Sequence, residues 1–260
     1  MTSAASARRA RPGNFAAAAV GLGALAAFLL AVEVLIQIGV VSRFIVPPPS
    51  EIIGSFGRVI IEEHVFSRFL LTLTECLTAG VMLTVFGVAG GVLMHRFKLL
   101  QQACETWVAA MASAPIVLMY PLFLVIFGRN AWTIIMMGFF AALPPVILKT
   151  IEGIAGTRKV LVNVGRSFNL NATQQFWKIL FPAALPTIFV GLRLGLIFAL
   201  INIVGVEFLI NFGGLGQLIN ELAERYDLAG TYAAICFVIL VSIVFFVALE
   251  KTERWLRPVD

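Results

Sequence analysis

The stretch "VNVGRSFNLNATQQFWKILFPAALP", residues 162–186, is a polar interruption in a strongly apolar chain. The whole sequence is 60% hydrophobic and only 13% charged, so the Asn, Gln and Arg side chains of this stretch stand out. A set of apolar residues at helical spacing begins just before it: Val160, Leu161, Val164 and Phe168. This periodicity predicts a short amphipathic helix that ends near Phe168.

Two asparagines follow this helix, one at its predicted end and one at the predicted start of a second helix. Asn169 is a residue type that tolerates the left-handed conformation in which helices often end. Asn171 is predicted to cap a second helix, with Gln174 completing a capping box. Pro182 then opens a long apolar run, where its missing backbone N–H costs least. The stretch predicts a helix, an Asn turn and a second helix; an ordinary amphipathic loop on the lipid head groups is the alternative.

The composition outside this stretch is that of a membrane protein. The chain has 260 residues and 22 Phe, with a mean hydropathy of +0.97, which is more apolar surface than a soluble domain could bury. Runs long enough to cross a bilayer as helices occupy residues 15–41, 68–94, 104–127, 131–151, 183–210 and 230–250. We therefore expect an all-α integral membrane protein with six transmembrane helices. Residues 1–14 would be a tail, residues 15–260 one transmembrane domain, and residues 155–182 its cytoplasmic loop.

The distribution of Lys and Arg predicts the orientation of this domain. If the N-terminus lies inside, thirteen of the nineteen basic residues fall in cytoplasmic segments and five in outer loops, while Arg193 lies within the fifth run. This asymmetry favours both termini in the cytoplasm. Two outer segments, residues 51–62 after "VPPPS" and residues 215–224 after a glycine pair, carry apolar residues near helical spacing. They are predicted to be interfacial helices or plain surface helices that shield loop edges.

Several kinds of chemistry find no support in the sequence. Cys76, Cys104 and Cys236 lie far apart among apolar neighbours, and His64 and His95 have no metal-ligand partners at suitable spacing. There is no G-x-x-x-x-G-K-[ST] motif for ATP. The basic residues lie between apolar runs and form no patch for nucleic acid. We expect this chain to bind no metal, cofactor or nucleic acid, and to be surrounded by membrane lipid.

The spacing of the polar stretch resembles the cytoplasmic loop of the permease subunits of bacterial binding-protein-dependent ABC importers. That loop reads E-A-A, three residues, Gly, nine residues, I-x-L-P. At these positions the chain has Asn163-Val164-Gly165, Asn169, Ile179 and Phe181-Pro182, so the spacing matches throughout and the side chains match in part. Four further segments resemble the permeases of nitrate, sulfonate and taurine importers: "VPPPSEI" (46–52), "SAPIVLMYPLFLVIFG" (113–128), "FPAALPTIFVGLRLGL" (181–196) and "GVEFLINFGGLGQLI" (205–219).

The resemblance implies a type I permease in a bacterial plasma membrane that performs no catalysis itself. It implies a homodimer, two copies of a separate ATPase subunit that holds ATP and Mg²⁺, and an extracytoplasmic solute-binding protein. A sulfonate-, taurine- or nitrate-like anion would be the solute. The residues implied in coupling to the ATPase are Asn163, Val164, Gly165, Arg166, Phe168, Asn169, Phe176, Ile179 and Pro182.

Polar residues within the apolar runs are candidates for a translocation pathway. A charged group at mid-membrane costs about 2.5 to 3.5 kcal/mol on insertion scales, so Glu33, Glu75 and Glu207 should face protein, water or an interface. The candidate pathway residues are Glu75, Met111, Ser113, Tyr120, Asn202 and Glu207. Hydrogen bonding between packed helices is the alternative role for the polar members of this set.

Other substrates and other classes of protein remain open at this point. The family usually has Arg where this chain has Glu75, and an acidic lining would suit a thiamine-precursor pyrimidine; an aromatic carboxylate is a further alternative. A secondary transporter without an ATPase is the rival class, although neither internal repeats nor basic partners for Glu33 or Glu75 are evident. A membrane enzyme would need a nucleophile, metal cluster or acid–base pair, which the sequence does not offer.

The pairs Gly87/Gly91 and Gly191/Gly195 predict close helix contacts.

Overall fold

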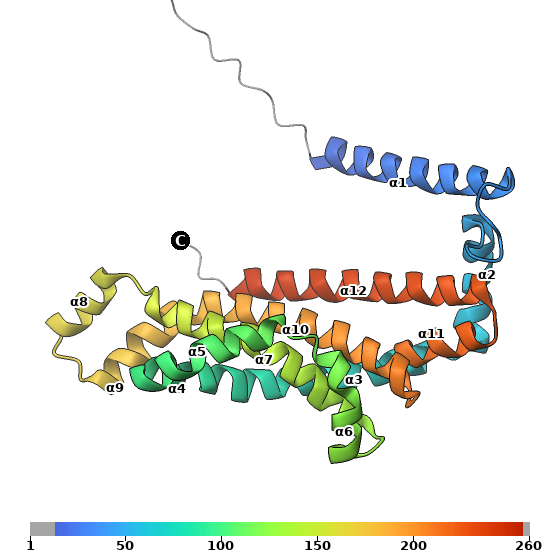
Figure 1. Ribbon diagram of the computed structural model, residues 1–260. Helices are drawn as coiled ribbons and strands as arrows, with labels where there is room; N and C mark the ends of the chain where they lie inside the picture. Colours follow the sequence, from blue (N-terminus) through green and yellow to red (C-terminus); the bar gives the residue numbers. More distant parts are fainter. Residues whose placement is uncertain (1–13, 257–260) are drawn as a thin grey trace, which may run out of the picture.

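A computed structural model describes residues 14–256, and every regular element in this range is a helix (Figure 1). The predicted tail, with Arg8, Arg9 and Arg11, lies outside the described residues apart from Asn14. The helices are α1 (Asn14–Gln37), α2 (Pro49–Glu62), α3 (Val65–Met82), α4 (Val88–Arg96), α5 (Lys98–Ser113), α6 (Tyr120–Phe127), α7 (Ala131–Ala155), α8 (Lys159–Ser167), α9 (Ala172–Gln175), α10 (Phe181–Ile210), α11 (Gly214–Glu224) and α12 (Leu228–Leu256). Three short helical turns, η1 (Leu83–Gly87), η2 (Ile116–Met119) and η3 (Phe176–Leu180), join neighbouring helices.

Within the described residues, five helical segments are long and apolar enough to cross a membrane. They are Ala19–Gln37, Val65–Arg96, Ala131–Ala155, Ala172–Ile210 and Leu228–Arg254. These segments confirm the predicted spans near residues 15–41, 68–94, 131–151, 183–210 and 230–250.

The third expected span, residues 104–127, is not one straight helix. Lys98–Ser113 and Ile116–Phe127 meet at an angle of 90°, and α6 projects sideways from the bundle in Figure 1. The break falls at Ala114, which is extended with ψ of 130°, directly before Pro115. Proline disfavours the helical conformation of the preceding residue and cannot donate a backbone hydrogen bond, which accounts for the break.

Helices α7 and α10 form the centre of the bundle, and glycines allow their close approach. A Cβ atom at Gly195 would lie 2.7 Å from Val146 Cγ2, and one at Gly191 would lie 2.6 Å from Lys149 Cβ. Gly87 and Gly91 approach Val146 and Thr150 of α7 just as tightly. Both predicted small-residue pairs therefore contact the same helix, α7.

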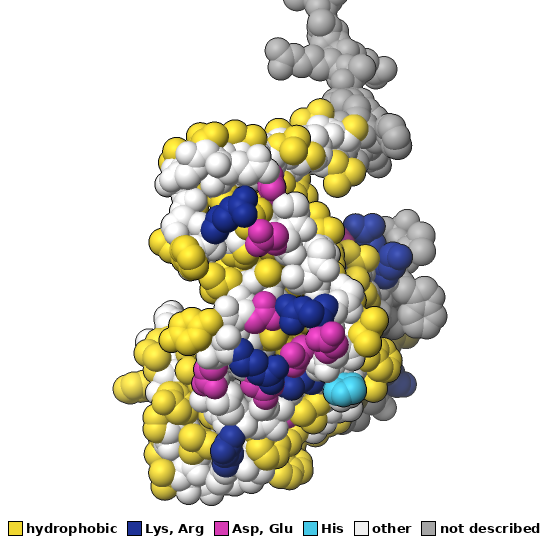
Figure 2. Space-filling model, turned by 90° about the vertical axis from the view of Figure 1, so that its right-hand side faces the viewer, with side chains coloured by type: hydrophobic (Ala, Val, Ile, Leu, Met, Phe, Trp, Pro, Cys, Tyr) yellow, Lys and Arg dark blue, Asp and Glu magenta, His cyan; other side chains and the backbone are white. Residues whose placement is uncertain are grey.

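The two amphipathic helices that the sequence predicts as outer segments, α2 and α11, form a second small core with the N-terminal parts of α3 and α12. Its buried residues are Val59, Val65, Leu215, Leu218, Leu222, Ala233 and Ala234. Acidic and basic side chains intermingle over this end of the molecule (Figure 2). Arg58 pairs with Asp227 at 2.5 Å, and Arg68 pairs with Glu221 at 2.7 Å. The predicted helices exist; α2 packs on α12, and α11 packs on both α12 and α3.

Helix α1 stands apart from the bundle (Figure 1). Its attachment is near its C-terminal end, where the Glu33 carboxylate accepts hydrogen bonds from the Ser50 amide at 3.1 Å and the Ser50 hydroxyl at 2.8 Å. Ser50 lies in the first turn of α2, where the helix dipole favours a negative charge. Glu33 thus connects α1 to the first turn of α2.

Candidate functional site

The polar stretch folds as a helix, an Asn turn and a second helix. The Leu170 amide donates to the Gly165 carbonyl at 3.1 Å, and the Asn169 amide donates to the Arg166 carbonyl at 2.9 Å. These two bonds form a Schellman motif, and Asn169 adopts the predicted left-handed conformation with φ of +54°. The turn between α8 and α9 is therefore defined by local chemistry.

The second helix begins with the predicted capping box. The Gln174 amide donates to Asn171 Oδ1 at 2.8 Å, and the Asn171 amide donates to Gln174 Oε1 at 3.1 Å. Helix α10 has Pro182 in its first turn as expected. However, the chain is already helical before Pro182. The π-helical turn η3 joins α9 to α10, so that residues Ala172–Ile210 form one continuous helix. The second short helix is thus a rigid extension of the fifth span.

Helix α8 is held against this extension by two contacts. A Cβ atom at Gly165, the buried residue of α8, would lie 2.5 Å from Ile179 Cδ1, so the absence of a side chain at Gly165 makes room for the end of the Ile179 side chain. Gln175 Nε2 donates to the Val162 carbonyl at 3.0 Å. The structure therefore brings Gly165 and Ile179 together and packs the partly buried Phe176 beside the Phe181 ring.

The apolar face of α8 faces away from the rest of the described chain. Val160 is 71% exposed and Phe168 is 75% exposed, and Leu161 and Val164 extend the same face. Asn163, Arg166, Asn169 and Pro182 are also exposed, so most of the residues implied in coupling are accessible to a partner. Figure 1 shows α8 and α9 at the opposite end of the molecule from α2 and α11.

A buried polar junction lies where α3, α10 and α11 meet. Glu207 on α10 is fully buried, and its carboxylate accepts hydrogen bonds from the Thr72 hydroxyl at 2.7 Å and the Gly216 amide at 2.8 Å. The Leu215 amide donates to the Thr72 hydroxyl at 3.0 Å. Glu75, one turn further along α3, is 2% exposed. The predicted residues Glu75 and Glu207 thus meet in the protein interior where α3, α10 and α11 join.

The glycines before α11 make this junction possible. Gly213 and Gly214 have positive φ angles of +135° and +81°. A Cβ atom at Gly214 would collide with the Glu207 carboxylate, and one at Gly216 would overlap the Val204 carbonyl. The first turn of α11 can therefore press its free amides against Glu207, where the helix dipole stabilises negative charge. The sequence shows a glycine pair before α11, and it did not predict this close approach.

The remaining pathway candidates gather near the 90° bend. Met111 and Ser113 are exposed in the last turn of α5, and Tyr120 opens α6 after the bend. The bend packs on α10, because a Cβ atom at Gly205 would lie 3.6 Å from Val117 Cγ2. Asn202, one turn before Gly205, donates its amide to the Phe198 carbonyl of its own helix at 2.9 Å. Met111, Ser113 and Tyr120 thus flank the bend, and Asn202 lies one turn from the point where the bend packs on α10.

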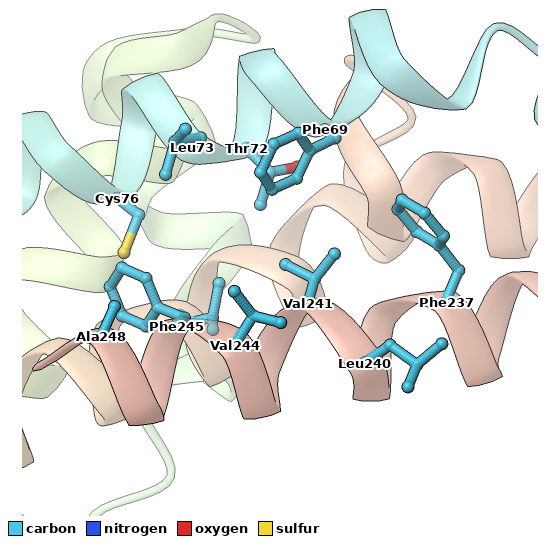
Figure 3. A pocket seen from close by; sticks show the side chains of 11 residues that line it. Phe69, Thr72, Leu73, Cys76, Phe237, Leu240, Val241, Val244, Phe245 and Ala248 are labelled. Atoms are coloured by element: carbon cyan, nitrogen blue, oxygen red, sulfur yellow. The ribbon is translucent and has the colours of Figure 1, made fainter. Parts of the chain in front are cut away.

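A cavity of about 360 Å³ lies between α3 and α12 (Figure 3). Apolar side chains from the two helices, among them Phe69, Val241 and Phe245, face each other across it, and Thr72 and Cys76 lie on its α3 side. The sequence does not predict this cavity, because the cavity depends on the separation of two helices that are distant in the chain.

No group of three or more His, Cys, Asp or Glu side chains between residues 14 and 256 could hold a metal ion.

The fold and the loop define a membrane component of a solute transport system. The chain belongs to the family described as binding-protein-dependent transport system inner membrane component, whose sequence model matches residues 83–258. The helical spans and the loop between α7 and α10 are thus parts of an ABC transporter permease, a translocation subunit of an inner membrane.

Curated relatives resemble almost the whole chain. The formylaminopyrimidine transport permease protein ThiX of Halalkalibacterium halodurans is 24% identical over 83% of this chain and 86% of its own length. The putative aliphatic sulfonates transport permease protein SsuC of Bacillus subtilis is 26% identical over 91% and 83%. The taurine transport system permease protein TauC of Escherichia coli is 21% identical over 92% and 89%. The resemblance to permeases of the sulfonate and taurine type is confirmed.

Solved structures confirm the fold class. The inward-facing MetNI methionine ABC transporter superimposes with a TM-score of 0.65 at 18% identity, covering 75% of this chain and 96% of that one. An amino acid ABC transporter with histidines superimposes with a TM-score of 0.60 at 17% identity, covering 76% and 96%. The chain therefore has the type I ABC importer permease fold.

Proposed function

We propose that this chain is the transmembrane subunit of an ATP-driven importer, working as a homodimer with two copies of a separate ATPase subunit. An extracytoplasmic binding protein delivers a small solute to the outer end, and both termini lie in the cytoplasm. The observation that carries the proposal is the exposed apolar face of α8, fixed by the Gly165–Ile179 contact to a helix that continues into the fifth span.

This geometry suits a mechanical linkage. An ATPase surface that covers Val160 and Phe168 would move α8, and α8 would move the continuous helix Ala172–Ile210 with it. Closure of two ATPase subunits would thereby rock the two permeases between inward-open and outward-open states. A second permease copy would cover the exposed bend near Met111 and Ser113, where the pathway is proposed to run.

We infer that the solute is a small anion of the sulfonate, taurine or nitrate kind, as the similarity to SsuC and TauC suggests. A thiamine-precursor pyrimidine is the second candidate, because the relative ThiX is a formylaminopyrimidine transport permease protein. A ligand screen by calorimetry on the cognate binding protein separates the two: sulfonate binding supports the first, and pyrimidine binding supports the second.

The test of coupling is co-purification of the detergent-solubilised permease with its ATPase. Phe168→Asp places a charge on the exposed apolar face of α8, and we expect it to abolish association and binding-protein-stimulated ATP hydrolysis. Phe168→Leu keeps the face apolar and should retain both. Unchanged association and stimulation in Phe168→Asp would overturn the proposal. Solute uptake in vesicles without any ATPase would instead favour the rival class, a secondary transporter.

A further inference from the structure

The buried junction contains two carboxyl groups that differ sharply in their surroundings. Glu207 receives hydrogen bonds on both oxygens, one from the Thr72 hydroxyl and one from the Gly216 amide. Glu75 is equally buried, yet neither of its oxygens accepts a hydrogen bond from any residue between 14 and 256. The carboxyl groups of Glu75 and Glu207 interact with each other.

No basic side chain among the described residues compensates a second negative charge here. Cys76, a neutral thiol beside Glu75 on α3, is the other titratable group that interacts with this pair. Helix α11 contributes only backbone amides. Arg68 and Arg129, the basic residues of α3 and of the turn before α7, bind Glu221 and the Asn211 carbonyl instead. Two adjacent carboxylates in this interior would each lack a counter-ion.

A buried carboxylate without hydrogen bonds is far more costly than a neutral carboxylic acid. The donors around Glu207 stabilise its charge, whereas nothing stabilises a charge on Glu75. Two carboxyl groups in contact avoid repulsion by sharing one proton. The same donors argue against a metal cation, because the Thr72 hydroxyl and the Gly216 amide direct hydrogen atoms at the oxygens that a cation would need.

We propose that Glu75 and Glu207 form a buried proton-binding site, in which Glu75 is a carboxylic acid that donates its hydrogen to the Glu207 carboxylate. The bound proton satisfies Glu75 and supplies Glu207 with a third donor. It also keeps the junction of α3, α10 and α11 together, because its loss would place two negative charges where α11 is anchored. This inference concerns the interior of the chain and stands independently of the proposed transport function.

Infrared spectroscopy of the full-length permease in detergent at neutral pH tests the protonation directly. A carboxylic acid has a C=O stretching band distinct from the two bands of a carboxylate, and this band shifts in D₂O. We expect the difference spectrum between wild type and Glu75→Gln to show the loss of one carboxylic acid band. A difference spectrum that shows only the loss of carboxylate bands would overturn the proposal.

Paired amide variants test the roles assigned to the two carboxyl groups. Glu75→Gln retains both the shape and the donor of a protonated Glu75, so we expect its thermal midpoint to stay within about 2 °C of wild type. Glu207→Gln presents an NH₂ group to the Thr72 and Gly216 donors, so we expect its midpoint to fall by about 5 °C or more. Equal losses in the two variants, or a larger loss in Glu75→Gln, would contradict the assignment.

Sodium titration separates a proton from a monovalent cation. With ionic strength held constant by choline chloride, the wild-type thermal midpoint should not change as NaCl replaces choline chloride. A sodium-dependent rise that is absent in Glu75→Gln would assign the site to a cation and overturn the proton proposal. Where Glu75→Gln does not accumulate, the band assignment is made by isotope editing, with ¹³C-labelled glutamate in wild type and in Glu207→Asp.

Discussion

The Thr72 hydroxyl on α3 donates to Glu207 Oε1 on α10 at 2.7 Å, across 135 positions of sequence. The same hydroxyl oxygen accepts the Leu215 amide of α11 at 3.0 Å. One small side chain therefore connects three helices that are distant in the chain. It makes the outer helix α11 part of the membrane bundle.

Replacing Thr72 with Val should destabilise this junction. The variant keeps the shape of the side chain but removes one donor to Glu207 and leaves the buried Leu215 amide without an acceptor, at a cost of about 1 to 3 kcal/mol. The thermal midpoint of the detergent-solubilised chain measures the loss. Thr74→Val is the matched control, since the exposed Thr74 hydroxyl bonds only the Leu71 carbonyl of its own helix. Equal midpoints for the two variants would contradict the role of Thr72.

The neighbouring glycines of α4 should respond differently to the same substitution. A Cβ atom at Gly91 would lie 2.5 Å from Thr150 Cβ and 2.9 Å from the Ile147 carbonyl oxygen, whereas one at Gly90 would lie 3.6 Å from the Ile147 side chain. Gly91→Ala should therefore force α4 away from α7 and cost about 1 to 3 kcal/mol. Gly90→Ala should be tolerated, because 3.6 Å is ordinary contact. Thermal unfolding of both variants checks this, and a tolerated Gly91→Ala would show that the helices are less tightly packed.

Replacing Asn169, in the turn after α8, with glycine or with alanine should have different effects on the stability of the turn. Asn169 has φ of +54°, so Asn169→Ala strains the backbone by roughly 1 to 2 kcal/mol. Asn169→Gly removes this strain and should be close to wild type. Hydrogen exchange of the α8 amides reports the difference, with faster exchange in the alanine variant. The same exchange rate in both variants would mean that the turn does not hold α8 in place.

The Asp227–Arg58 pair should make the outer end sensitive to acid. Burial raises the pKa of Asp227, but hydrogen bonds from Arg58 at 2.5 Å and from the Gly230 amide at 3.0 Å outweigh it, so the net pKa is lowered. A lowered pKa in the folded state means that the pair stabilises the fold above the unfolded pKa of Asp. This stabilisation is lost as the pH falls through the lowered value.

The thermal midpoint of Asp227→Asn should therefore fall less than that of the wild type as the pH is lowered into the acidic range. The effect should be modest, about 1 kcal/mol or less, because the pair is partly exposed to solvent. Glu105→Gln on α5, whose carboxylate is exposed and bonds only Gln101 nearby, is the control. If the thermal midpoint of Asp227→Asn falls as much at acidic pH as that of the wild type, the contribution of this pair is contradicted.

The sequence by itself determined the helical spans and the structure of the polar stretch. Both depend on neighbouring residues: a span needs a run of apolar side chains, and the Asn169 turn and the Asn171–Gln174 capping box close within a few positions. The spacing of the loop also led correctly to the permease family, because the loop geometry is preserved although Asn163 and Asn169 replace the usual side chains.

Only the tertiary structure decided which distant groups meet. The sequence places Glu75 and Glu207 in separate apolar runs, and no local pattern indicates that they touch or that Gly214 and Gly216 allow α11 to reach Glu207. The continuity of α9 with α10, and the 90° bend before α6, were likewise missed. Contacts between helices depend on how whole surfaces pack, and a buried carboxyl group acquires its protonation and its partners from that packing.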